Sequence, residues 1–274
     1  MKNKLMNKVF TSLALTAATT VSMAAHASEL DASLTPEQQG LAISQASKDS
    51  DEGWQDMQGE MNMVLRNKQG QESVRAVRMS SLEVQGDGDK SLSVFDEPRD
   101  VKGTAFLSFS HAVGADEQWL YLPALKRVKR IASRNKSGPF MGSEFAYEDL
   151  SSFEVEKYTY KYVGTEACGE LQCYVVENYP VDKNSGYTRR IAWIDTAELR
   201  AQKVDFYDRK NSLLKTLTYE GYKEYEGKHW RPDLMKMVNH QSGKSTDLAW
   251  SGYRFKTGLK DADFNKNTLK RAGR

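Results

Sequence analysis

Positive charge is most concentrated in a run of four cations within five residues, Lys126, Arg127, Lys129 and Arg130. Such groups can contact anionic lipid headgroups or the acidic surface of a protein partner, and each contributes about 1 kcal/mol beside an anionic membrane. In an extended strand they fall on both faces, which predicts an edge or rim position, where lysines also discourage pairing with another chain. A protective edge and a binding surface therefore both remain open.

The histidines are scattered. His111, His229 and His240 lie in separate segments, and the sequence contains no G-x-S-x-G, H-E-x-x-H or phosphate-binding P-loop motif. A hydrolase would need one of them to meet a nucleophile and an acid in a cleft, so this class ranks third among our hypotheses. We predict no catalytic residue, no metal site and no cofactor.

A cluster of carboxylates follows the basic run, with Glu144, Glu148 and Asp149 close together. Glycosidases use two carboxyl groups that face each other across a cleft. We favour a plainer interpretation, in which Ser143 caps a solvated helical turn and the acids lie near its positive end.

Methionines and aromatic residues recur at alternate positions of the expected strands. The polarisable Met side chain adapts to varied apolar shapes, so such a surface can form the wall of an acyl-chain cavity. The same residues would equally form a closed core, because alternation does not separate a filled interior from an empty one. The residues predicted to line an apolar cavity are Met57, Met61, Met63, Leu107, Phe109, Trp119, Tyr121, Phe140 and Phe145.

The first 27 residues have the layout of a secretory signal peptide. Three lysines precede an apolar stretch, and residues 25–27 form an Ala-His-Ala cleavage site. Removing this segment takes Lys+Arg from 39 to 36 against 37 Asp+Glu, so the formal charge changes from +2 to −1. We therefore expect an exported protein and no nucleic-acid partner.

Export would place the two cysteines, Cys168 and Cys173, outside the reducing cytoplasm. In an oxidising compartment this spacing predicts a disulfide that clamps a hairpin. Because the loop is short, the chain-entropy model gives a stabilisation of roughly 2 kcal/mol.

The elements that position these residues are mostly strands. Thr35, Pro36 and Gln38 form a capping box that predicts one helix, ending near Gly53. From residue 54 onward the period changes to two, and about a dozen strands separated by turns predict an all-antiparallel sandwich or barrel. Short helical signals remain at residues 143–152 and 262–269. We expect a single domain over residues 28–274.

Residues 119–131 (WLYLPALKRVKRI), 140–145 (FMGSEF) and 147–150 (YEDL) resemble the outer-membrane lipoprotein-sorting protein family, the LolA/LolB-like group. The similarity is greatest to its transporter-associated, less characterised branch. Weaker resemblance extends over most of the chain after residue 27, including residues 230–232 and 263–264.

The resemblance implies a half-open antiparallel β-barrel whose apolar concave face is covered by a few short helices as a lid. It also implies a non-enzymatic periplasmic carrier or chaperone that takes up a lipid or lipoprotein acyl chains, with transient membrane contact through the basic rim. The main alternative is an accessory module of an inner-membrane, efflux-type transporter that holds no lipid.

Overall fold

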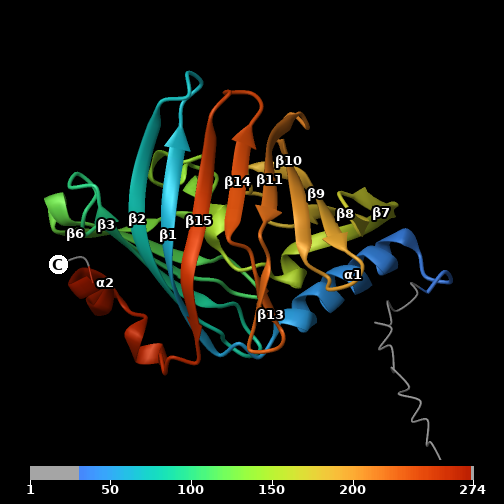
Figure 1. Cartoon of the computed structure of the whole chain (residues 1–274), viewed down its shortest axis with the longest axis horizontal. Coiled ribbons are helices and arrows are strands. Elements are labelled where there is room, and N and C mark those ends of the chain that lie inside the picture. The colour runs from blue at the N-terminus through green and yellow to red at the C-terminus, as the bar shows by residue number, and fades with distance from the viewer. Residues whose placement is uncertain (1–30, 273–274) are drawn as a thin grey trace, which may run out of the picture.

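The computed structural model describes residues 31–272, so the predicted signal peptide lies outside the described residues. Thirteen strands form one antiparallel sheet in the order β6-β5-β4-β3-β2-β1-β15-β14-β11-β10-β9-β8-β7. The sheet curves strongly and is not closed, with β6 and β7 at its two edges (Figure 1). This is the half-open, mainly β architecture that the family resemblance implies. The strands of the sheet are β1 Asp56–Arg66, β2 Glu72–Leu82, β3 Lys90–Glu97, β4 Ala105–Phe109, β5 Glu117–Leu122, β6 Arg127–Ile131, β7 Tyr158–Cys168, β8 Leu171–Pro180, β9 Tyr187–Asp195, β10 Ala201–Asp208, β11 Leu213–Glu220, β14 Leu234–Asn239 and β15 Ser245–Phe255.

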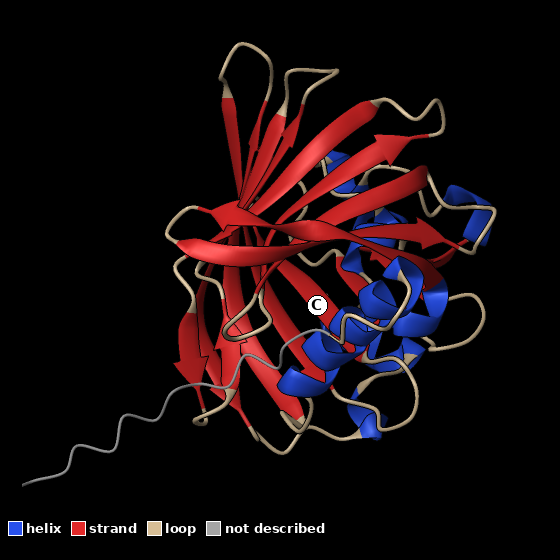
Figure 2. Ribbon diagram, turned by 90° about the vertical axis from the view of Figure 1, so that its right-hand side faces the viewer, coloured by secondary structure: helices blue, strands red, loops and turns tan. Residues whose placement is uncertain are grey.

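The remaining elements are short. A small ribbon pairs β12 Lys223–Tyr225 with β13 His229–Arg231. The helices are α1 Pro36–Asp51 and α2 Lys266–Ala272, with 3₁₀ turns η1 Pro123–Leu125, η2 Ser133–Asn135, η3 Phe140–Gly142, η4 Tyr147–Leu150, η5 Val155–Lys157 and η6 Asp261–Asp263. Figure 2 shows most of these helical segments gathered on one side of the curved sheet.

Helix α1 begins where the sequence predicts. Thr35 accepts a hydrogen bond from the backbone N–H of Gln38, whose side chain in turn accepts one from the backbone N–H of Thr35. The helix packs mainly on β7 and also contacts β8 and β13. Its buried face carries Gly40, Ile43 and Ser44, and the small residue at 40 lets the helix backbone approach β7 closely.

The convex face of the N-terminal half of the sheet has its own apolar cluster. Leu107 on β4 and the pair Trp119 and Tyr121 on β5 point to this side. The C-terminal segment covers them with Phe264 and Leu269, which are 3% and 0% exposed. This contact explains why α2 lies outside the curve of the sheet in Figure 1.

The concave face of the same half is filled by residues 132–157, which we call the plug segment. Phe140 and Phe145 are 2% and 1% exposed and pack in one cluster with Met61 and Met63 of β1. The Phe140 ring also lies 5.0 Å from that of Phe106 on β4. The interior is therefore closed here by the chain's own aromatic side chains.

Candidate ligand-binding cavity

A cavity of about 1580 Å³ lies on the concave face of the C-terminal half of the sheet. Its walls are α1, the plug segment and the loops after β2 and β4, and its floor is formed by β8 to β11 and β14. This volume exceeds the roughly 300–1,000 Å³ of ordinary small-molecule sites. The space can therefore accommodate a long ligand.

The floor of the cavity is apolar because the strands are in register across it. Ala192 on β9 pairs with Val204 on β10, which pairs with Leu217 on β11. Side chains two residues apart along a strand share a face, so Ile194 and Tyr219 extend this floor toward α1. The further apolar or aromatic lining residues are Phe206, Met235, Tyr222, Trp230 and Tyr158.

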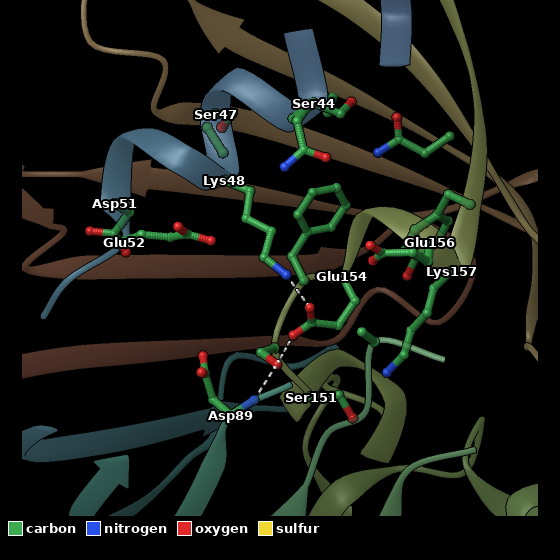
Figure 3. A pocket seen from close by; sticks show the side chains of 18 of the residues that line it. Ser44, Ser47, Lys48, Asp51, Glu52, Asp89, Ser151, Glu154, Glu156 and Lys157 are labelled. Atoms are coloured by element: carbon green, nitrogen blue, oxygen red, sulfur yellow. Dashed lines mark hydrogen bonds and ion pairs between the residues drawn. The ribbon is translucent and has the colours of Figure 1, made fainter. Parts of the chain in front are cut away.

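The wall opposite the floor is polar and tightly hydrogen-bonded. Lys48 of α1 forms an ion pair with Glu154 of the plug segment, which is 2% exposed (Figure 3). Ser152 donates to the same carboxylate at 2.5 Å and accepts from the backbone N–H of Asp89 at 3.2 Å. This network ties the helix, the plug segment and the loop after β2 together beside the cavity.

The carboxyl group of Asp89 has an altered proton affinity. Burial raises its pKa to about 7, and the nearby carboxylates of Glu154 and Glu83 act in the same direction. A hydrogen bond from the backbone N–H of Val84 opposes the shift. Asp89 therefore changes charge near neutral pH at the edge of the cavity.

The C-terminal end of α1 is fixed separately. Asp51 accepts a hydrogen bond from Arg231 at 2.7 Å and lies 3.2 Å from the Nδ1 atom of the buried His229. Lys228 also donates to the backbone carbonyl of Glu52 at 2.7 Å. These contacts hold the helix over the cavity through the β12–β13 ribbon.

Three buried polar atoms in the cavity lining have no hydrogen-bond partner within residues 31–272. They are Oγ of Ser44, Oδ1 of Asn178 and Nε of Arg190. Asn178 on β8 and Arg190 on β9 are directly paired across the two strands. Buried polar atoms normally find partners, so this concentration marks a place where a ligand can supply them.

The Arg190 guanidinium is held by aromatic rings. Its central carbon lies 4.1 Å from the ring centre of Tyr158 and 5.7 Å from that of Phe153. No ion pair involves Arg190 in the described part of the chain. Burial raises the pKa of Tyr158, so its hydroxyl stays neutral.

None of the nine residues predicted from the sequence to form the cavity wall lines this cavity. Met61, Met63, Phe140 and Phe145 are brought together in the concave cluster, where the interior is filled. On the convex side lie Leu107, Phe109, Trp119 and Tyr121, while Met57 is partly buried on β1. Their role in ligand binding stays a prediction, and the cavity involves other residues.

The basic run lies where its pattern predicts. β6 is an edge strand of the sheet, and Lys126, Arg127, Lys129 and Arg130 are all exposed. Arg130 donates to Glu117 on β5 at 3.2 Å. A role in binding a membrane or partner remains a prediction.

The interpretation of residues 143–149 as a solvated, capped turn is wrong. Ser143 donates to the carbonyl of Phe140 and caps no helix, since η4 begins at Tyr147. Glu148 accepts from Ser185 and from the backbone of Gly186, both at 2.8 Å, and burial raises its pKa. Glu148 therefore attaches the plug segment to the loop between β8 and β9.

The histidines lie apart. His111 contacts Asp87 at 2.8 Å, His229 contacts Asp51, and His240 contacts Thr216 at 2.8 Å. Within residues 31–272 no group of three or more His, Cys, Asp or Glu is arranged to hold a metal ion.

Cys168 and Cys173 form the predicted disulfide at the β7–β8 turn, with Cα atoms 5.9 Å apart. Among the described helices, neither has the length and apolar character needed to cross a membrane.

A half-open antiparallel barrel whose concave face holds a cavity is a LolA-like architecture, and solved structures share it. A family model described as "Uncharacterized protein" matches residues 87–271. An outer membrane lipoprotein-sorting protein domain from Vibrio parahaemolyticus is 60% identical, with a TM-score of 0.85, over 86% of this chain and 100% of that chain. The chain belongs to the outer-membrane lipoprotein-sorting protein family.

Two further structures fit this assignment. A DUF1329 family protein from Desulfovibrio piger is 30% identical, with a TM-score of 0.82, over 86% of this chain and all of its own. A LolA superfamily protein from Nitrosomonas europaea shares the fold at 20% identity and a TM-score of 0.68, with the same coverage. The comparison with curated proteins gave no match. This fold supports a carrier or chaperone kind of role.

Proposed function

We propose that the protein is a periplasmic, non-enzymatic carrier that holds the acyl part of a lipid or lipidated protein in the cavity beneath α1. The observation that carries this proposal is the cavity of about 1580 Å³ over the Ala192–Val204–Leu217 floor. Each buried CH₂ of an acyl chain gains about 0.8 kcal/mol, so an unfilled apolar floor of this size favours a long aliphatic ligand. The family's name and the predicted signal peptide support the same role and compartment.

The test is native mass spectrometry and lipid extraction of the mature protein purified from the periplasm. We expect copurified lipid in the wild type and its loss in Ala192→Trp, which fills the floor with an indole ring. Val238→Trp is the matched control, since Val238 on β14 is 44% exposed and points away from the buried face. Lipid-free wild type, or a lipid-loaded Ala192→Trp variant that keeps a cooperative thermal transition, would refute the proposal.

A second part of the proposal concerns the basic edge. The exposed cations of residues 126–130 lie on the edge strand β6 and directly before it, where they can approach anionic lipid headgroups as cargo is received or delivered. An inner-membrane transporter that presents an acidic surface is the alternative partner for the same cations.

A further inference from the structure

The floor of the cavity changes from polar to apolar along β9, and this change indicates what kind of lipid it takes. At one end, Asn178 on β8, Arg190 on β9 and Phe206 on β10 stand in register across the concave face. Two residues further along β9, Ala192 begins the apolar floor, and Ile194 follows it. At about 3.3 Å per residue, the floor extends roughly 13 Å from Arg190 to Ile194.

The cations around the polar end differ in whether a carboxylate of the protein already binds them. Lys136 is bound to Asp182 at 2.8 Å, and Lys215 is bound to Asp149 at 2.6 Å. Arg190 has only the aromatic faces of Tyr158 and Phe153 beside it, and its Nε is buried without an acceptor in the described residues. Arg190 is therefore the cation at this end that retains hydrogen-bonding capacity for a ligand.

The carboxylates near Arg190 are already engaged. Glu148 accepts hydrogen bonds from Ser185 and Gly186. Asp149 accepts from Lys215, from the Tyr187 hydroxyl at 2.8 Å and from the backbone of Ala146. Neither contributes an acceptor to the guanidinium, so an anion that enters the cavity does not have to displace a protein partner from Arg190.

Asn178 adds a second, independent sign of a ligand. Its side chain is 4% exposed, lines the cavity and holds an oxygen without a partner among the described residues. The Oδ1 atom of the amide accepts, so a donor such as a headgroup hydroxyl would complete it, while the amide N–H groups can donate to a carboxylate or phosphate oxygen. Asn178 stands directly opposite Arg190, and the two can bind the same group.

We propose that the cavity selects an amphiphile with an anionic group at one end, bound by Arg190 and Asn178, with its aliphatic chain on the Ala192–Ile194 side. This inference rests on the proposed carrier function and narrows its ligand class. A fatty-acid carboxylate and a lysophospholipid phosphate share the required chemistry. A charge-assisted hydrogen bond at a buried site is strong, so the anionic group should raise affinity by about tenfold to a hundredfold.

The experiment is calorimetric titration of the delipidated mature protein with three probes of similar chain length: palmitate, palmitoyl-lysophosphatidic acid and hexadecanol. We expect at least one anionic probe to bind about tenfold or more tightly than hexadecanol. Arg190→Met should abolish this preference by weakening the binding of the anionic probes far more than that of hexadecanol, and Asn178→Leu should reduce the preference. Preference for palmitate identifies the carboxylate source, and preference for the lysophospholipid identifies the phosphate source.

Arg189→Met is the matched control, because Arg189 is the neighbouring arginine on β9 and bonds instead to Glu177. It should keep the anionic preference. Equal affinity of the wild type for all three probes, or an unchanged preference in Arg190→Met, would overturn the inference while leaving the carrier function standing. If none of the probes binds, the carrier function fails and the inference fails with it.

Discussion

Lys215 on β11 donates a hydrogen bond to Asp149 of the plug segment at 2.6 Å, and both side chains are only 4% exposed. The same ammonium group donates to the backbone carbonyl of Glu144 at 2.8 Å. One lysine thus joins two points of the plug segment to the concave face. We predict that Lys215→Met lowers the free energy of unfolding by about 3–5 kcal/mol, because it leaves the Asp149 charge buried without its cation.

Urea unfolding followed by tryptophan fluorescence measures this loss. The double variant Lys215→Met with Asp149→Asn should be less destabilised than Lys215→Met alone, since it leaves no unpaired charge. The control is Lys236→Met, which breaks the exposed pair with Glu220 and should cost under about 1 kcal/mol. Equal costs at positions 215 and 236 would contradict the assigned role of Lys215.

Gly40 determines how closely α1 sits on β7. A Cβ atom built on Gly40 would lie 2.8 Å from the backbone N of Tyr162 and 2.9 Å from backbone atoms of Lys161. Alanine is ordinarily favoured over glycine inside a helix by about 1 kcal/mol. We predict the opposite sign here: Gly40→Ala pushes α1 away from β7, lowers amide hydrogen-exchange protection of the helix and speeds ligand loss from the cavity.

The Ala46→Gly variant is the control, because it changes the helix propensity of α1 without changing how the helix packs on β7. Ala46 is exposed on the same helix, so this change weakens the helix by about 1 kcal/mol without creating a clash. It should leave the ligand dissociation rate near that of the wild type. A Gly40→Ala variant that is more stable and releases ligand no faster would disprove the close-approach argument.

Local signals in the sequence were reliable because they depend on adjacent residues. The capping box at Thr35 fixes the start of α1, and the short cysteine spacing gives the β7–β8 disulfide. Alternation also identified the strands, while the mixed faces of residues 126–130 identified an edge.

What alternation does not specify is the side of the sheet to which each face belongs. Trp119 and Tyr121 were expected at a cavity, yet they pack under the C-terminal segment, and Leu120 between them faces the concave interior.

The cavity residues were missed for a related reason. Arg190 stands in an alternating stretch with Ala192 and Ile194, so its inward position was visible in principle. Nothing in the local pattern showed that the concave face would be filled at Met61 and left open at Ala192. That outcome depends on where the plug segment and α1 dock, which are contacts distant in sequence.

The basic edge gives a prediction for membrane contact. Reversing charge at Lys126, Arg127, Lys129 and Arg130 should weaken binding to vesicles that contain anionic lipid by about 1 kcal/mol per cation near the surface, and less at high salt. Cosedimentation with vesicles of phosphatidylglycerol and phosphatidylethanolamine measures this. A variant with Lys68, Lys210 and Lys244 reversed, all exposed in other turns, is the control. Equal loss in both variants would show general electrostatics and no role for the edge.

Asp89 should make stability depend on pH. Its pKa is about 7 in the folded protein, against 3.8 for the free side chain, so the folded state binds the proton more tightly. Stability from this residue is therefore complete below pH 3.8 and is lost as the pH rises toward and through 7. We predict that Asp89→Asn, which stays neutral, is more stable than the wild type at pH 8 and equally stable near pH 4.

Asp87, two residues away, provides the opposite case. Its contact with His111 and bonds from the backbone N–H groups of Ala112 and Gly88 lower its pKa to about 2, so its contribution is present above pH 3.8 and lost only as the pH falls through 2. Asp87→Asn should accordingly be less stable than the wild type throughout pH 4–8. The measurement is the urea midpoint of unfolding of both variants and the wild type at several pH values from 4 to 8. If the difference in midpoint between Asp89→Asn and the wild type were the same at every pH, Asp89 would not titrate near neutrality.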